Sequence, residues 1–171
     1  MRLLSERITS HLQKIVGQKL IEVNLFCFDY EIDSLALENL PFYFGGELNL
    51  NFENDVAIIT WDENAGWQDH FSLYLGQERR YPPTSSLVKW NVSKFQPWTN
   101  CINKKLTLAQ IYKDKIYKDN DTPHIIELSF NNIKIFVGDS SEIRLGDGDD
   151  VLITTKLPDD DWEVMWKSSS S

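Results

Sequence analysis

The chain lacks several features that would point to a particular chemistry. Its 171 residues include only two cysteines and three histidines. The histidines, His11, His70 and His124, have no second histidine at a spacing typical of metal ligands. Neither a G-x-S-x-G nucleophile motif nor a phosphate-binding G-x-x-x-x-G-K is present. The sequence therefore predicts no catalytic site and no cofactor, and we expect a protein that is not an enzyme.

Long apolar runs are also missing. No run reaches the roughly 18 residues that a membrane-spanning helix needs, and the N-terminus has no apolar core before a small-residue cleavage site. We therefore expect a cytoplasmic protein that does not bind a membrane. Small secreted scaffolds carry more cysteines than Cys27 and Cys101, so we predict two buried thiols rather than a disulfide.

Positive charge is scarce in one part of the chain. The net charge is −9, and residues 139–163, with nine acidic and two basic side chains, contribute −7 of it. Nucleic acid is not an expected ligand, because binding it requires lysines and arginines that neutralise phosphates. A basic protein is the partner that this charge favours. The residues that we predict to contact it are Asp147, Asp149, Asp150, Asp159, Asp160, Asp161, Trp162 and Glu163.

Part of the acidic stretch has a second interpretation. Residues 145–153 nearly match one nonapeptide of the calcium-binding parallel β-helices and lack only its first glycine. Those proteins hold calcium between successive repeats, whereas this chain has a single copy. We interpret the segment as an acidic, glycine-rich turn before a strand. A calcium site at Asp147, Asp149 and Asp150 is the alternative, because hard cations prefer clustered oxygen atoms.

What the chain does contain is a fragment that occurs twice. The first copy reads V-G-Q-K-L at 16–20, L-N-L-N-F at 48–52 and V-A-I-I at 56–59; the second reads I-N-K-K-L at 102–106, I-E-L-S-F at 126–130 and I-K-I-F at 133–136. Alternating apolar residues around a tight turn are typical of a hairpin with one buried face. This alignment matches Phe52 with Phe130 and Ile58 with Ile135, and it predicts two related β-meander units.

The segment before each copy predicts how it begins. Apolar residues at spacings of three and four indicate an amphipathic helix over 2–16. Gly17 ends this helix in the left-handed conformation, and Asn103 stands at the matching place in the second copy. Strands are expected at 19–30, in a hairpin over 47–62, and at 67–75, 105–112, 124–130, 133–138 and 151–156, with connections over 31–46 and 77–86.

These elements predict a mainly β protein of the α+β type. The two units, about residues 1–76 and 87–167, form a single domain that we expect to be a sandwich in preference to one barrel. Residues 162–166 are an apolar closing segment, and residues 168–171 are predicted to be a disordered tail.

The acidic stretch 147–163, together with the helix-then-strand start at 16–20 and its echo at 102–106, resembles the layout of the immunity proteins that bacteria pair with secreted toxins. The resemblance implies non-catalytic binding of a cognate toxin and carries over no functional residues. One alternative is a small-molecule carrier or enzyme whose site lies inside a barrel, lined by Phe26, Phe28, Tyr30 and the tryptophans. Another is a structural subunit of a larger assembly.

Overall fold

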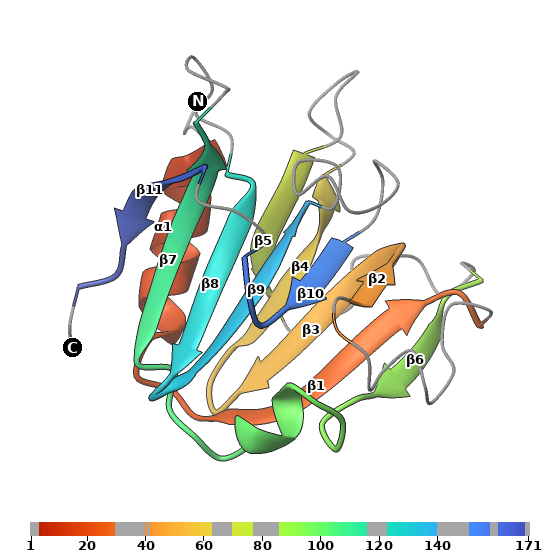
Figure 1. The fold of residues 1–171 in the computed structure, drawn as a ribbon. Coiled ribbons are helices and arrows are strands. Elements are labelled where there is room, and N and C mark those ends of the chain that lie inside the picture. The colour runs from red at the N-terminus through yellow and green to blue at the C-terminus, as the bar shows by residue number, and fades with distance from the viewer. Residues whose placement is uncertain are drawn as a thin grey trace.

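The computed structural model describes residues 4–29, 40, 42–62, 70–76, 86–115, 123–139, 151–157 and 161–169. Over these residues the protein is mainly β, with two antiparallel sheets packed together and one α-helix (Figure 1). The sheets do not close into a barrel, so the predicted sandwich is confirmed. No helix among the described residues is long and apolar enough to cross a membrane.

The sheets have the strand orders β5-β4-β3-β1-β6 and β11-β7-β8-β9-β10-β2. The elements are α1 (Leu4–Ile15), β1 (Leu20–Cys27), β2 (Phe42–Phe44), β3 (Gly46–Phe52), β4 (Val56–Asp62), β5 (His70–Gly76), β6 (Val88–Asn91), the short 3₁₀ helix η3 (Trp98–Asn100), β7 (Leu108–Asp114), β8 (Ile125–Phe130), β9 (Ile133–Asp139), β10 (Val151–Thr154) and β11 (Trp162–Lys167).

Each sheet is built around one antiparallel meander. The first meander is β1-β3-β4-β5 and the second is β7-β8-β9-β10. Phe52 ends β3 and Phe130 ends β8, and a two-residue turn follows each of them. The two phenylalanines therefore occupy equivalent strands, as the repeat predicts.

The predicted match of Ile58 with Ile135 is wrong by one residue. Leu50 pairs with Ala57 in the first hairpin, and Leu128 pairs with Ile135 in the second, so Ala57 is the counterpart of Ile135. Ala57, Ile58 and Ile59 are all buried. Since both faces of this strand are covered, its apolar run has no alternation from which the register can be read.

The two halves meet at the segments that carry the repeat. Lys19 and Lys105 form an antiparallel bridge with each other. Four backbone hydrogen bonds cross this contact in two matched pairs. In the first pair, Gly17 N–H donates to Leu106 O and Asn103 N–H donates to Leu20 O. In the second pair, Leu20 N–H donates to Lys104 O and Leu106 N–H donates to Gln18 O. Such reciprocal contacts are the mark of a twofold relation. The halves of this single chain are thus arranged around a pseudo-twofold axis.

The pseudo-twofold axis also relates the two helical segments, α1 and η3. The amide of Val16 bonds to Leu12 O, and the amide of Ile102 bonds to Trp98 O. Trp98 of η3 therefore stands where Leu12 stands in α1, and both side chains are buried in the core. Gly17 and Asn103 follow with φ angles of 91° and 65°, which confirms the predicted left-handed ends of both segments.

Three strands outside the meanders were not predicted. β6 extends the first sheet beside β1, and β11 extends the second beside β7, the counterpart of β1. β2 lies within the predicted connection 31–46, and it joins β10 of the second sheet although β3 follows it directly in the first. Gly46 allows this crossing, because its φ is 150° and a Cβ there would lie 1.9 Å from Phe26 O.

The cysteine prediction is confirmed, because Cys27 and Cys101 are free and buried. The chain end differs from the predicted disordered tail. The amide of Ser168 donates to Ala109 O at 2.9 Å, its Oγ accepts the Ala109 N–H at 3.1 Å, and the amide of Ser169 donates to Gln13. Pairing along β7 thus continues past the end of β11, while residues 170 and 171 lie outside the described residues.

Candidate functional site

Three of the residues predicted to contact a partner have a described position. Asp161 immediately precedes β11, Trp162 and Glu163 are its first two residues, and Asp161 and Glu163 are exposed. The other predicted contact residues, Asp147, Asp149, Asp150, Asp159 and Asp160, lie outside the described residues. The same holds for the alternative calcium site at the first three of these.

β11 is the outermost strand of its sheet. It pairs with β7 on one side, and no other described strand lies on its second side (Figure 1). The exposed side chains along it include Val164, which is 48% exposed, and Glu163, which pairs with Lys113 at 3.7 Å. An extra residue interrupts the pairing between Val164 and Trp166. This edge strand therefore carries an exposed acidic side chain on one face and an exposed apolar side chain on the other.

Trp162 ties this edge to the outer face of the sheet. Its ring packs against an apolar cluster of Ile125, Phe136 and Leu152, which is separate from the core between the sheets. The indole Nε1 is buried and has no hydrogen-bond partner among the described residues. Trp162 is thus a half-buried anchor beside exposed carboxylates.

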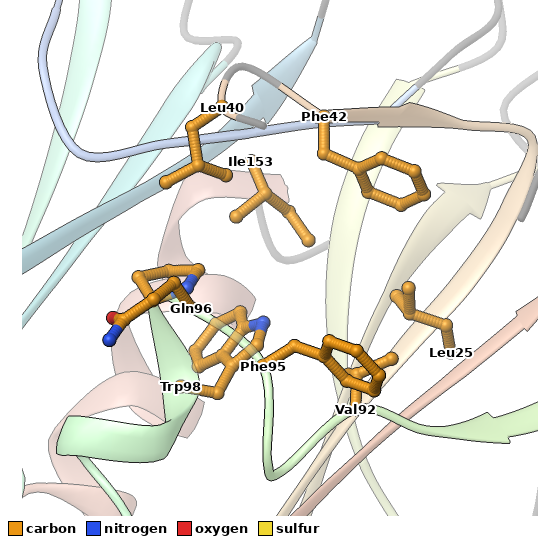
Figure 2. Close-up of a pocket in the computed structure, with 9 residues that line it drawn as sticks. Leu25, Leu40, Phe42, Val92, Phe95, Gln96, Trp98 and Ile153 are labelled. Carbon is orange, nitrogen blue, oxygen red and sulfur yellow. The ribbon is translucent and has the colours of Figure 1, made fainter. Parts of the chain in front are cut away.

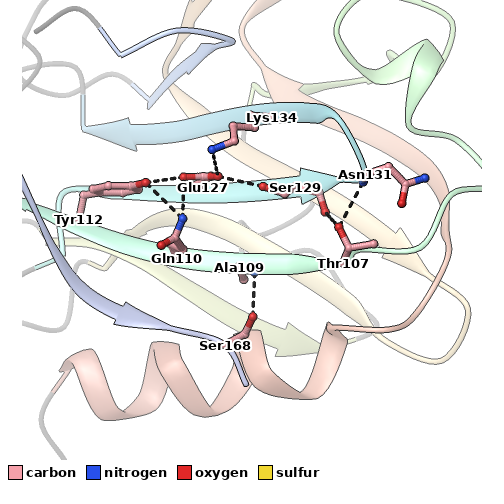
Figure 3. Close-up of polar contacts among 9 residues, drawn as sticks. All are labelled: Thr107, Ala109, Gln110, Tyr112, Glu127, Ser129, Asn131, Lys134 and Ser168. Atoms are coloured by element: carbon pink, nitrogen blue, oxygen red, sulfur yellow. Dashed lines mark hydrogen bonds and ion pairs between the residues drawn. The ribbon is translucent and has the colours of Figure 1, made fainter. Parts of the chain in front are cut away.

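The outer face of the second sheet also holds a polar network that the sequence did not reveal (Figure 3). Its centre is Glu127, which is 0% exposed. The carboxylate accepts hydrogen bonds from Gln110 Nε2 at 3.0 Å, Ser129 Oγ at 2.9 Å and the Tyr112 hydroxyl, and it pairs with Lys134 Nζ at 3.1 Å. These side chains come from three strands, and alternation alone does not show that they meet.

This network sets the ionisation of its own members. Burial alone would raise the pKa of Glu127, but hydrogen bonds from Tyr112, Ser129 and Lys134, together with the lysine charge, hold that pKa below its ordinary value. Burial raises the pKa of Tyr112, and the bond to the Glu127 carboxylate raises it further. With four donors around it, the carboxylate is fully engaged within the protein, and we interpret the network as structural.

An apolar cleft opens beside η3 (Figure 2). It is lined by Leu25, Leu40, Phe42, Val92, Phe95, Gln96, Pro97, Trp98 and Ile153. Its volume is about 10 Å³, which is room for a single water and far below the roughly 300 Å³ of a small ligand site. The cleft is therefore a packing gap where η3 meets β1, β2 and β10.

The prediction that aromatic side chains line a barrel cavity is wrong for Phe26. Leu25 and Cys27 belong to the core between the sheets, so Phe26, between them on β1, lies on the outer face. Phe28 is half-buried, and Tyr30 lies outside the described residues. Because the sheets form a sandwich, the carrier hypothesis loses the enclosed interior on which it depended.

Two of the three histidines bond to backbone atoms. His124 Nδ1 accepts the N–H of Asp114 at 3.0 Å, and His11 Nδ1 donates to Leu73 O at 3.1 Å. Within the described ranges, no three histidine, cysteine or acidic side chains are grouped so as to hold a metal ion.

Comparison with known proteins found no match to this chain among protein-family models, curated proteins or solved structures.

Proposed function

We propose that the protein is a non-catalytic acidic binding module that holds a basic protein partner at the β11 edge, as an immunity protein holds its cognate toxin. The observation that supports this proposal is the composition of that edge. Exposed Asp161 immediately precedes β11. Exposed Glu163 and Val164, which is 48% exposed, follow on opposite faces of this strand, and no other described strand pairs with its second side. Apolar contact flanked by charge is the usual make-up of a protein interface.

The charge of the chain supports a basic partner. The sequence carries −9 in total, of which residues 139–163 contribute −7. Opposed charges steer partners together and raise association rates more than they raise affinity. A protein that neutralises a toxin needs a complementary surface and no reaction chemistry, which agrees with the fully engaged carboxylate of Glu127.

The test uses the protein encoded by the toxin-like reading frame that we expect next to this gene. Its association with the chain is followed by stopped-flow fluorescence from low salt up to about 1 M, where the Debye length is about 3 Å. The variant D161N/E163Q should associate several-fold more slowly at low salt, with its affinity changed less. The matched control E6Q/D29N removes the same charge from two exposed acids in the first half of the chain.

Equal slowing in both variants would mean that only the overall charge matters. Association that is independent of salt, or no association at all, would contradict the proposal. Circular dichroism of both variants establishes that neither substitution changes the fold.

A further inference from the structure

The pseudo-twofold relation allows the outer faces of the two sheets to be compared position by position. Asn24 of β1 lies directly opposite Asn49 of β3, as Gln110 of β7 lies directly opposite Glu127 of β8. The same place in the two meanders thus carries polar side chains. In the second meander the Glu127 carboxylate at this place is neutralised by Lys134.

The first meander has no such lysine. Lys134 lies opposite Ser129, and the equivalent pair in the first meander is Val56 opposite Asn51. An apolar side chain therefore replaces the internal cation.

The first meander nevertheless holds a carboxylate there, that of Glu22. Three amide groups donate to it: Asn24 Nδ2 at 2.8 Å, Asn51 Nδ2 at 2.8 Å and Asn91 Nδ2 at 2.7 Å. Neutral amides orient a carboxylate without removing its charge. Among the described residues Glu22 has hydrogen bonds but no ion pair, in contrast to Glu127.

Two further acceptors on this face have no hydrogen-bond partner among the described residues. Asn24 and Asn49 are 2% and 6% exposed, and the Oδ1 atom of each is buried with no hydrogen bond among the described residues. Buried polar atoms in proteins are almost always paired with protein groups, ordered water or an ion. The Asn24 amide touches Glu22, so one of these acceptors adjoins the carboxylate.

Glu22 also opens onto a groove. The groove has a volume of about 780 Å³ and is lined by Ile21, Glu22, Asn51, Phe52, Glu53, Asn91, Ser93 and Lys94. Glu53 is already paired with Lys19 at 3.9 Å. Lys94 is the one cation in the lining, and it makes no ion pair with Glu22. The groove thus combines an oriented carboxylate, which has no ion pair among the described residues, with the side-chain amide oxygen of Asn51.

We propose that this groove binds a guanidinium group, the side chain of an arginine on the basic partner. The partner rests on the proposed function, whereas the guanidinium site is tested without it. The planar guanidinium carries five donors in a fixed fork, which suits Glu22 and the amide oxygen of Asn51 on a flat sheet face. A metal ion suits the groove less, because three amide N–H groups leave the Glu22 carboxylate about one free lone-pair site, which a single guanidinium N–H can use, whereas a hard cation needs roughly six or more oxygen ligands.

The probe is ethylguanidinium, with uncharged ethylurea as its isosteric control and calcium as the competing ion. Binding is read from the ¹⁵N side-chain amide resonances of Asn51 and Asn91 in the full chain. Millimolar ethylguanidinium should shift both resonances, and ethylurea should not. E22Q should weaken binding about tenfold, the matched groove variant E53Q should leave it nearly unchanged, and K94Q should tighten it.

Several results would overturn the inference. Equal shifts with ethylurea would make the groove a neutral polar site, and stronger shifts with calcium would make it a metal site. Undiminished binding to E22Q would place the cation elsewhere. If the partner associates with E22Q as well as with the native chain, the arginine contact is wrong even though the β11 interface stands. Guanidinium binding without any basic partner would instead contradict the proposed function alone.

Discussion

The outer face of each sheet holds a carboxylate, but the two carboxylates have different partners. Glu127 on the second sheet is fully buried, receives three hydrogen bonds and pairs with Lys134. Glu22 on the first sheet is half-buried, receives three amide hydrogen bonds and adjoins an open groove. The Glu127 carboxylate is therefore neutralised within the protein, whereas the Glu22 carboxylate faces an open groove.

The inner faces show no such difference. Phe52 and Phe130, Leu20 and Leu106, and Leu12 and Trp98 are equivalent pairs, and all six side chains belong to one core. The comparison teaches that the packed inner faces retain the symmetry of the repeat, while the outer faces are free to diverge. Specific binding is thus expected on the outer faces and edges, where the two halves differ.

The largest expected effect tests the equivalence of the inner faces. Phe52→Ala and Phe130→Ala should each lower the free energy of unfolding by about 4 kcal/mol, because each removes a large buried side chain and leaves a cavity. Urea denaturation followed by tryptophan fluorescence measures both losses. Losses that differ by more than about 2 kcal/mol would break the symmetry of the core.

The next effect tests the contrast between the outer faces. Glu127→Gln should cost about 3 kcal/mol, because it breaks a buried ion pair and points an amide at hydrogen-bond donors. Glu22→Gln should cost under about 1 kcal/mol, since this half-buried side chain exchanges its bonds with water more easily. Equal losses in chemical denaturation would remove the distinction that we draw between a closed and an open carboxylate.

The same two variants should differ in how their free energy of unfolding depends on pH. The folded-state pKa of Glu127 is lowered, so its stabilising contribution is present above the ordinary glutamate value of about 4.3 and is lost as the pH falls through the lower folded value. Acid unfolding of Glu127→Gln should therefore depend less on pH than that of the native chain. Glu22→Gln is the control, because it makes the same substitution outside the Glu127 network.

The smallest effect concerns the Cys101 thiol, whose structural counterpart in the first half is not titratable. Cys101 is the counterpart of Ile15, as the matched bonds of Gln18 to Ile15 O and Lys104 to Cys101 O indicate. Burial raises the pKa of the Cys101 thiol from 9.0 to about 12, although Lys104 opposes this. The thiol's contribution is then complete below pH 9 and is lost as the pH rises toward 12.

Unfolding free energy should therefore fall by about 1 kcal/mol more in the native chain than in Cys101→Ala between neutral pH and about pH 10. Denaturation at the two pH values measures this difference. Identical pH dependence in both proteins would show that the thiol does not titrate differently on unfolding.

Much of the fold could be predicted because it depends on short-range patterns. Glycine at position 17 and asparagine at 103 tolerate positive φ, so the ends of the two helical segments could be read directly. Alternation around the turns after Phe52 and Phe130 indicated both hairpins. The register of β4 was misjudged because Ala57, Ile58 and Ile59 are buried on both faces and leave no alternation.

The candidate sites were much less predictable. Of the acidic residues predicted to bind a partner, Asp161 and Glu163 are exposed at the β11 edge, but the strand itself was expected only as an apolar closing segment. The Glu127 network and the Glu22 cluster were missed. Each gathers side chains from three strands, and nothing in the sequence states which strands are neighbours.

The sequence by itself determined the elements whose causes are local, namely the amphipathic helix, the left-handed residues that end it and its counterpart, and the two hairpins of the repeat. Backbone sterics and the two-residue period of a strand act within a few residues, so their effects can be predicted from the sequence alone. Only the tertiary structure decided that β2 joins the opposite sheet and that β6 and β11 cover equivalent edges. It also decided that Lys134 neutralises Glu127, whereas Glu22 has no ion pair among the described residues. Pairings between distant segments follow from packing of the whole chain, because each cross-strand pair contributes only about 0.2 to 1 kcal/mol.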